Sequence, residues 1–173
     1  MTNIRSCCFT GHRPKALPWK RDESDVRCAA LKSELRYTVE DLIVTQGYEK
    51  FISGMAQGAD MICAEVVLAL KNVYPHIKLE CAIPNRAFTV KWALEDVRRY
   101  SSILTRADYI NFISEEKSYD KYSKQDLMLR NIYMVDNSDV IIAVYKEGES
   151  GGTKNTIDYA ISKNKDVIII SPE

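Results

Sequence analysis

Net charge is the first thing this chain lacks. Its 24 lysines and arginines are balanced by 24 aspartates and glutamates, so its formal charge at pH 7 is zero. A chain without excess cations has no overall field to attract nucleic acid or an anionic membrane, so any attraction to phosphate must come from a local basic cluster. No apolar run approaches the roughly 20 residues of a membrane span. We therefore expect a cytoplasmic protein that uses neither partner.

Cysteine and histidine are also scarce. Cys7, Cys8, Cys28, Cys63 and Cys81 are odd in number, lie in apolar contexts and have no ligand-like spacing. This pattern predicts reduced thiols and no metal site. Neither of the two histidines has a serine or cysteine partner in the sequence that would suggest a catalytic triad. We interpret His12 as a structural hydrogen-bonding residue.

The order of apolar segments predicts an α/β fold. With 173 residues and 46% hydrophobic side chains, the chain can form one domain, residues 1–173, with a substantial core. Strand-like runs occupy residues 5–9, 50–53, 77–83, 107–113, 140–145 and 167–170. Helical patterns occupy residues 24–46, 62–70, 88–104, a segment around Arg130 that Ser123 can cap, and 156–162. This alternation favours a Rossmann-like three-layer fold, with a mostly parallel central sheet flanked by helices.

Three glycine turns follow strand-like runs, at residues 10–14, 53–60 and 150–153. The carboxyl ends of parallel strands meet along one edge of a sheet, so we expect the three turns to form one pocket. Glycine lets the backbone approach a ligand closely, and a helix that starts at such a turn presents amide hydrogens to an anion. The candidate ligand-binding residues are Thr10, Gly11, Arg13, Ser53, Gly54, Met55, Gly58, Asp60, Arg130, Asn131, Gly151, Gly152 and Thr153.

Charged residues near these turns have more than one interpretation each. Arg130 is either a bidentate phosphate ligand or a solvated helix charge paired with Asp126. Asp60 is a first-turn helix charge, an acceptor for loop amides, or an acceptor for a ribose hydroxyl. Arg13 either reaches the pocket or lies on the surface. Two polar loops, residues 14–23 and 114–122, are either lids over the ligand or ordinary surface loops.

Several of these segments occur together in a known family. They are residues 8–14 (CFTGHRP), 54–60 (GMAQGAD), Pro84 followed by Trp92, 134–139 (MVDNSD) and 150–153 (SGGT). Together they resemble the YpsA-like family of the SLOG superfamily, whose Rossmann-like domains are related to DprA and to the Lonely-Guy (LOG) phosphoribohydrolases. The resemblance spans nearly the whole chain. It implies a nucleotide-derived ligand such as NAD or an ADP-ribose derivative.

The LOG enzymes offer a catalytic comparison, because they use Arg-Lys-x-x-Met before Pro-Gly-Gly-x-Gly-Thr-x-x-Glu. Arg130 and Met134 match that pattern. The departures are Asn131 for lysine, Ser150 for proline, Lys154 for the third glycine, Asn155 for threonine and Asp158 for glutamate. Arg130 and Asp158 are therefore the catalytic candidates, but the shorter carboxylate and the changed turn weaken the match.

Three functions follow. The first is binding or sensing of a nucleotide-derived ligand, with no cofactor required. The second is cleavage of the N-glycosidic bond of a nucleoside 5′-monophosphate, with Asp158 as base or charge stabiliser and Arg130 on the phosphate. The third is DprA-like binding of single-stranded DNA, which the neutral charge disfavours. Self-association into a homo-oligomer is a further expectation from the superfamily.

Overall fold

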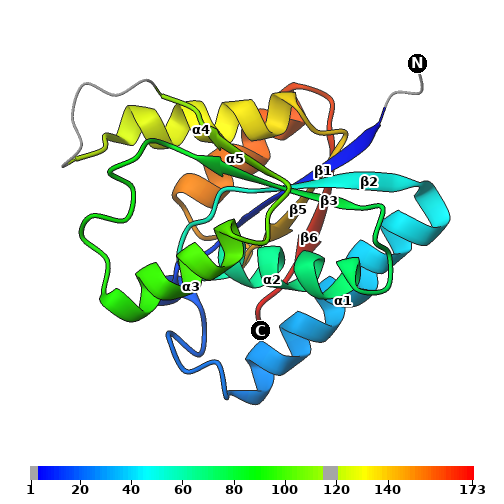
Figure 1. Cartoon of the computed structure of the whole chain (residues 1–173), viewed down its shortest axis with the longest axis horizontal. Helices are drawn as coiled ribbons and strands as arrows, with labels where there is room; N and C mark the ends of the chain where they lie inside the picture. The colour runs from blue at the N-terminus through cyan, green and yellow to red at the C-terminus, as the bar shows by residue number, and fades with distance from the viewer. Residues whose placement is uncertain (1–3, 115–120) are drawn as a thin grey trace.

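The protein is built around a six-stranded sheet. The computed structural model describes residues 4–114 and 121–173. The strands are β1 (Arg5–Gly11), β2 (Tyr48–Ser53), β3 (Lys78–Ile83), β4 (Tyr109–Phe112), β5 (Val140–Val144) and β6 (Asp166–Ile170). They lie in the order β4-β3-β2-β1-β5-β6, and every neighbouring pair is parallel (Figure 1). The predicted parallel sheet is confirmed.

Helices cover both faces of the sheet. They are α1 (Val26–Gln46), α2 (Ala59–Lys71), α3 (Leu94–Leu104), α4 (Lys124–Asp136), α5 (Gly152–Ser162) and the short 3-10 helix η1 (Pro14–Ala16). In Figure 1, α4 and α5 lie on one face, and α1, α2 and α3 lie on the other. The predicted three-layer Rossmann-like arrangement is therefore present.

The strand order creates a switch point in the middle of the sheet. The chain proceeds outward from β1 to β4 on one side and then returns to place β5 on the opposite side of β1. Loops that leave β1 and β5 therefore diverge, and in such sheets ligands bind at the carboxyl ends of the strands at this point. The register pairs Gly11 with Val144, which brings the ends of the two strands together.

Burial explains why these segments form central strands. Every residue of β5 is buried, as expected for a β-branched strand covered on both faces. The β4 edge strand is exposed along its whole length. The five cysteines are all buried and unpaired. In the described ranges, no helix is long and apolar enough to cross a membrane.

The helix ends follow their local signals. Gly47 adopts the left-handed conformation, with φ of 70°, and ends α1 as predicted. Ser123 caps α4 through a reciprocal capping box with Asp126. Asp126 therefore stabilises the start of α4, and the alternative that it pairs with Arg130 at the surface is wrong.

One predicted helix is shorter than expected. The pattern over residues 88–104 predicted a helix throughout, whereas α3 begins at Leu94, and residues 86–92 form turns followed by a bend. The apolar residues at helical spacing in this segment belong instead to an aromatic cluster. Phe88 and Trp92 form an edge-to-face pair with ring centroids 5.1 Å apart, and Tyr122 and Tyr100 extend this aromatic cluster. The strand at residues 107–113 is likewise shorter, whereas β1 continues through Thr10 and Gly11.

The loop at residues 14–23 lies along one side of the β1 end and is tied to the helices. Arg99 of α3 forms ion pairs with Glu23 at 2.5 Å and with Glu65 of α2 at 2.6 Å. Burial raises the pKa of Glu23, but hydrogen bonds from Arg99 and Lys32 outweigh that effect, and the net pKa is lowered. The loop is therefore held in place. For the second predicted lid at residues 114–122, residues 115–120 lie outside the described ranges.

Candidate functional site

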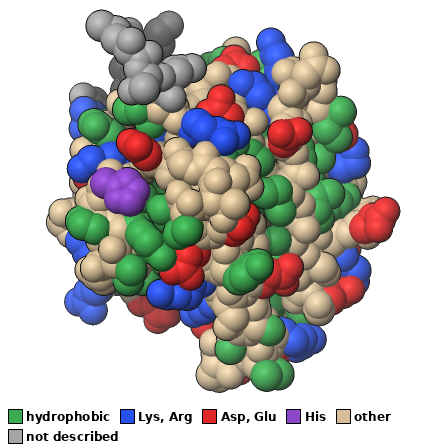
Figure 2. Space-filling view, turned by 90° about the vertical axis from the view of Figure 1, so that its right-hand side faces the viewer, with side chains coloured by type: hydrophobic (Ala, Val, Ile, Leu, Met, Phe, Trp, Pro, Cys, Tyr) green, Lys and Arg blue, Asp and Glu red, His purple; other side chains and the backbone are tan. Residues whose placement is uncertain are grey.

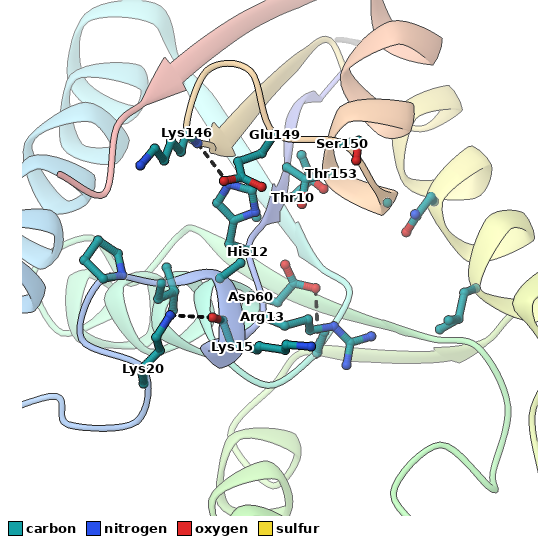
Figure 3. A pocket seen from close by; sticks show the side chains of 18 of the residues that line it. Thr10, His12, Arg13, Lys15, Lys20, Asp60, Lys146, Glu149, Ser150 and Thr153 are labelled. Carbon is teal, nitrogen blue, oxygen red and sulfur yellow. Dashed lines mark hydrogen bonds between the residues drawn. The ribbon is translucent and has the colours of Figure 1, made fainter.

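A cleft of about 770 Å³ opens at the carboxyl ends of β1 and β5. Its walls come from the β1–α1 loop, the start of α2, the inner face of α4, the β5–α5 loop and the last residue of the chain. The cleft lies at the switch point of the sheet, and its volume suits a small-molecule ligand. Figure 3 shows Ser150 and Thr153 on one side, Asp60 and Arg13 on the other, and Thr10 and His12 between them.

Arg130 reaches the floor of the cleft from α4. Only 4% of its surface is exposed. Its Nη1 donates to the carbonyl of Gly54, and its Nε donates to Asn131 Oδ1 at 2.8 Å. Burial lowers the pKa of Arg130 to about 10, although Asp60 acts in the opposite direction. The guanidinium therefore remains charged at neutral pH, and the alternative of a solvated surface charge is wrong.

The loop after β2 brings Asp60 close to Arg130. An added Cβ on Gly54 would lie 2.6 Å from Arg130 Nη1 and 2.9 Å from Asp60 Oδ2, so both side chains flank this glycine. Asp60 Oδ2 accepts from the Ala56 amide at 3.2 Å. The Ser53 hydroxyl donates to the Asp60 carbonyl at 2.8 Å. Asp60 thus orders the loop by accepting its amide hydrogen, as one interpretation predicted.

Asp60 is 5% exposed, and its charge is poorly accommodated there. Burial raises the pKa of its carboxyl group above the ordinary value, while Arg130 and Arg13 act in the opposite direction. Two guanidinium groups and one carboxylate thus share the floor of the cleft. Their charges leave a local excess of one positive charge, which favours an anionic group on a ligand.

His12 lies between the ends of β1 and β5. Its Nε2 accepts from the Lys146 amide at 2.9 Å, and its carbonyl accepts from the Ala59 amide at 3.1 Å. Burial lowers the pKa of His12, while Glu149 acts in the opposite direction. The predicted structural hydrogen-bonding role of His12 is confirmed, because it connects the β5–α5 loop to the end of β1.

The N-terminus of α5 forms the opposite wall. Its N-cap, Gly151, has φ of 126°, a conformation that favours glycine, and contributes no capping side chain. Gly152 and Thr153 then line the cleft. The first amides of α5 therefore have no side-chain acceptor, and the positive end of the helix dipole faces the cleft.

Further cations surround the opening. Lys15 and Lys20 come from the β1–α1 loop, and Lys146 comes from the β5–α5 loop. Lys146 forms an ion pair with Glu173 at 2.6 Å. The Arg13 guanidinium lies 5.9 Å from the centroid of the Phe88 ring. The surface elsewhere is mixed: on the face seen in Figure 2, acidic and basic side chains alternate with apolar ones.

Most of the predicted ligand-binding residues meet in this cleft. Those that line it are Thr10, Gly11, Arg13, Asp60, Arg130, Asn131, Gly152 and Thr153. Those that lie behind the lining and shape it are Ser53, Gly54, Met55, Gly58 and Gly151. Met55 has a positive φ of 58°, and an added Cβ on Gly58 would lie 2.6 Å from the His12 carbonyl. The three glycine turns do converge.

Asp158 lies elsewhere. It is on the exposed side of α5, where it forms an ion pair with Lys154, and 54% of its side chain is exposed. It is outside the set of residues that line the cleft. The structure instead adds residues that sequence patterns did not single out, namely Lys15, Lys20, Lys146, Glu149 and Glu173. Nearness in sequence to the glycine turns could have indicated the first four, whereas Glu173 follows β6, far from any of these turns in the sequence.

The sheet order, the cleft at its switch point and the glycine turns define a Rossmann-like α/β protein with a polar ligand-sized site. Within that class, the chain belongs to the YspA SLOG family, whose model, YpsA, matches residues 7–170. The resemblance inferred from the sequence motifs is confirmed.

Relatives and one solved structure agree with this assignment. The SPbeta prophage-derived protein YoqJ of Bacillus subtilis (strain 168) is 34% identical over 137 residues, which cover 75% of this chain and 80% of YoqJ. A UPF0398 protein of Bacillus thuringiensis (strain Al Hakam) is 31% identical over 165 residues, covering 94% and 85%. DNA processing protein A from Helicobacter pylori, solved in a study of its single-stranded DNA binding mode, has a TM-score of 0.64 at 17% identity. That alignment covers 95% of this chain and 64% of the other, and it shows the fold alone.

Proposed function

We propose that the cleft binds a nucleotide-derived phosphate ester, such as a nucleoside monophosphate or an ADP-ribose derivative. The observation that carries the proposal is the buried, charged Arg130 facing the uncapped N-terminus of α5 across the cleft. A guanidinium can donate hydrogen bonds to two phosphate oxygens, and the free amides at the start of a helix donate to the same group. Each element favours an anion, and together they define where it would lie.

Binding without hydrolysis is the version that the geometry favours. In the LOG pattern, the carboxylate at the position of Asp158 takes part in cleavage of the N-glycosidic bond. Asp158, the candidate from the LOG pattern, is exposed and engaged with Lys154 on the outside of α5. We therefore propose a binding or sensing role, and retain hydrolysis only as an outcome of the test described below.

DNA binding is a weaker candidate for this chain. The Helicobacter pylori protein is a single-stranded DNA binder by its description, but the likeness between the two concerns the fold. Five lysines and arginines of this chain line a compact cleft, whereas a nucleic-acid strand requires a basic surface that follows its backbone. A compact cationic cleft fits a small phosphate ester better.

Isothermal titration at low salt tests the proposal with AMP, ADP-ribose, pyrophosphate and a short oligo(dT). We expect saturable binding of at least one phosphate ester, and a loss of affinity of about tenfold or more in Arg13→Met and in Arg130→Leu. Circular dichroism identifies a variant that fails to fold. Since Arg13 is only half-buried, Arg13→Met provides the test if Arg130→Leu does not fold.

Lys165→Met is a matched control, because it removes a cation at the opposite end of the sheet. Its affinity should equal that of the wild type. The proposal fails if no phosphate ester binds, if both arginine variants bind as tightly as the control, or if oligo(dT) binds while the small ligands do not. Chromatography of the same mixtures detects any free base. Its release would favour the hydrolase hypothesis over binding alone.

A further inference from the structure

His12, Asp60 and Arg130 are buried residues of the cleft that each have a polar side-chain atom without a described hydrogen-bond partner. In the described part of the chain, the polar side-chain atoms that are both sealed from solvent and unpartnered are Trp19 Nε1, Ser114 Oγ and Ser138 Oγ. Three more atoms lack a described hydrogen-bond partner but are not sealed: His12 Nδ1, Asp60 Oδ1 and Arg130 Nη2. All three residues line the cleft, so these atoms reach it.

The hydrogen bond from Lys146 determines which nitrogen of His12 carries the proton. Because the Lys146 amide donates to Nε2, that nitrogen must hold a lone pair, and a neutral ring then has its hydrogen on Nδ1. The two nitrogens of an imidazole point in divergent directions, so the Nδ1–H group is directed away from Lys146. Figure 3 shows the ring between Lys146 and Asp60, within the cleft. His12 is therefore a neutral donor, fixed in place, and only 7% exposed.

Asp60 supplies the complementary group. Its Oδ2 is engaged by the Ala56 amide, which holds the carboxylate in place, and its Oδ1 remains available as an acceptor. A phosphate oxygen cannot pair with this atom, because both are acceptors and both carry negative charge. A hydroxyl group can donate to Asp60 Oδ1 and can accept from His12 Nδ1–H. The hydrogen bond from the Ala59 amide to the His12 carbonyl keeps His12 and Asp60 on adjoining segments.

We infer that His12 determines specificity by donating a hydrogen bond from Nδ1 to a sugar hydroxyl of the ligand, while Asp60 accepts one from a sugar hydroxyl. This inference rests on the proposed function, because Arg130 and the start of α5 must hold the phosphate. It adds that the ligand is a phosphorylated sugar with free hydroxyls, and it excludes a bare polyphosphate as the preferred ligand. Unpaired polar groups in the cleft penalise a ligand that lacks the matching hydroxyls.

The test compares AMP with 2′,3′-dideoxy-AMP, which differ only in two hydroxyls, and uses pyrophosphate as a probe of the phosphate site. Isothermal titration of the wild type should give an affinity for AMP at least about tenfold higher than for the dideoxy compound, the effect of one hydrogen bond. In His12→Gln, the side-chain oxygen can still accept from the Lys146 amide, but the Nδ1 donor is lost. The ratio of the two affinities should fall towards one.

His12→Asn is the matched variant. Its amide nitrogen can occupy the position of Nδ1, so it should recover most of the preference for AMP even though the bond to Lys146 is lost. A purely structural His12 would give the reverse order, with His12→Gln resembling the wild type. If neither variant folds, Asp60→Asn tests the other half of the pair, because an amide nitrogen can replace the free carboxylate oxygen that accepts from the sugar hydroxyl. The ratio of the affinities for AMP and dideoxy-AMP should again fall towards one.

Each result decides between the two levels of the proposal. Equal affinity of the wild type for AMP and dideoxy-AMP overturns the role of His12 and Asp60 but leaves the phosphate site. Binding of pyrophosphate without binding of AMP would also overturn the role of His12 and Asp60 and leave the phosphate site. Failure of all three probes to bind overturns the proposed function and this inference with it. A wild-type preference that disappears in His12→Gln and returns in His12→Asn supports the inference.

Discussion

The two ends of the sheet use polar residues in opposite ways. At the amino end, a hollow of about 610 Å³ is lined by Ser6, Asp139, Lys165 and their neighbours. There, Asp139 Oδ2 accepts from the Ser6 amide at 2.8 Å, the Asp139 amide donates to the Ser6 carbonyl at 2.7 Å, and Lys165 Nζ donates to the Ser138 carbonyl at 2.7 Å. At the carboxyl end, buried side chains leave polar atoms facing the cleft.

This difference separates a structural hollow from a candidate binding site better than volume does, since the two volumes are similar. Apart from the sealed Ser138 hydroxyl, the polar groups named at the amino end satisfy one another, and they hold β1 next to β5. At the carboxyl end, atoms of His12, Asp60 and Arg130 lack a described protein partner and remain available to a ligand. Substitutions at the two ends should therefore separate stability from binding.

Gly54→Ala should have the largest effect, because it places a methyl group against the buried Arg130 side chain at the floor of the cleft. The new Cβ would lie 2.6 Å from Arg130 Nη1 and 2.8 Å from Arg130 Cζ, and the buried guanidinium has no room to retreat without losing its partners. We expect a loss of at least about 3 kcal/mol in the free energy of unfolding, combining overpacking with a displaced buried charge. Urea denaturation measures the loss, and titration with AMP should detect no binding.

Gly152→Ala is the control for this variant. An added Cβ there meets nothing within 4 Å, and α5 begins at this residue with an ordinary backbone conformation. Its stability should remain within about 0.5 kcal/mol of the wild type. Equal stability of Gly54→Ala and Gly152→Ala would contradict the close packing of Arg130 against Gly54.

Asp139→Ala should affect stability alone, because it acts at the other end of the sheet. It leaves the Ser6 amide without the acceptor that it now has at 2.8 Å. Loss of a partly buried hydrogen bond to a charged group costs about 1–3 kcal/mol. The free energy of unfolding should fall by that amount while the affinity for AMP stays unchanged. Weakened AMP binding in a folded Asp139→Ala protein would break the proposed division between the two ends.

Much of this arrangement could be predicted from the sequence. Buried β-branched runs indicated the central strands, and the glycine turns indicated where the strands end, because parallel topology brings those ends together. Gly47 and Ser123 marked helix boundaries through local backbone and capping chemistry that requires no tertiary context. The start of α3 was predicted wrongly because Phe88 and Trp92 have helical spacing but pack as an aromatic cluster within turns.

The details of the cleft could not be predicted, since they depend on side-chain directions. The sequence left Arg130 with two interpretations, and only its burial against Gly54 decides between them. Asp158 follows the LOG spacing, yet α5 is rotated so that this residue faces outward and pairs with Lys154. The tautomer of His12 depends on an amide 134 residues away in the chain. One-domain organisation, self-association and cytoplasmic location stay predictions.

Asp60→Asn should increase stability at neutral pH while it weakens AMP binding. The pKa of Asp60 is raised above its ordinary 3.8, chiefly by burial, so the ionised carboxylate is less favourable in the folded state than in the unfolded chain. Its stabilising contribution is fully present below pH 3.8 and is lost as the pH rises through the raised pKa. The amide is neutral throughout, so the variant should be more stable at pH 7, and its advantage should shrink as the pH falls towards 4.

Urea denaturation at a series of pH values measures that difference. A variant that is less stable than the wild type at pH 7 would mean that attraction between Asp60 and Arg130 outweighs the cost of burial. A gain in stability together with a loss of affinity would instead mark Asp60 as a residue kept for binding at the expense of the fold.

Asp158→Asn should have the smallest effect, and it tests where the site ends. Asp158 and Lys154 form an exposed pair four residues apart on α5, an arrangement worth about 0.3–0.5 kcal/mol. We expect a change in the free energy of unfolding no larger than that, and an unchanged affinity for AMP in isothermal titration. Lys154→Gln removes the same ion pair from its other partner and should behave identically. If Asp158→Asn alone lowers the affinity for AMP, or abolishes the release of free base in a wild type that shows such release, then α5 must present this carboxylate to the ligand, and the LOG-like hydrolase becomes the better account of the cleft.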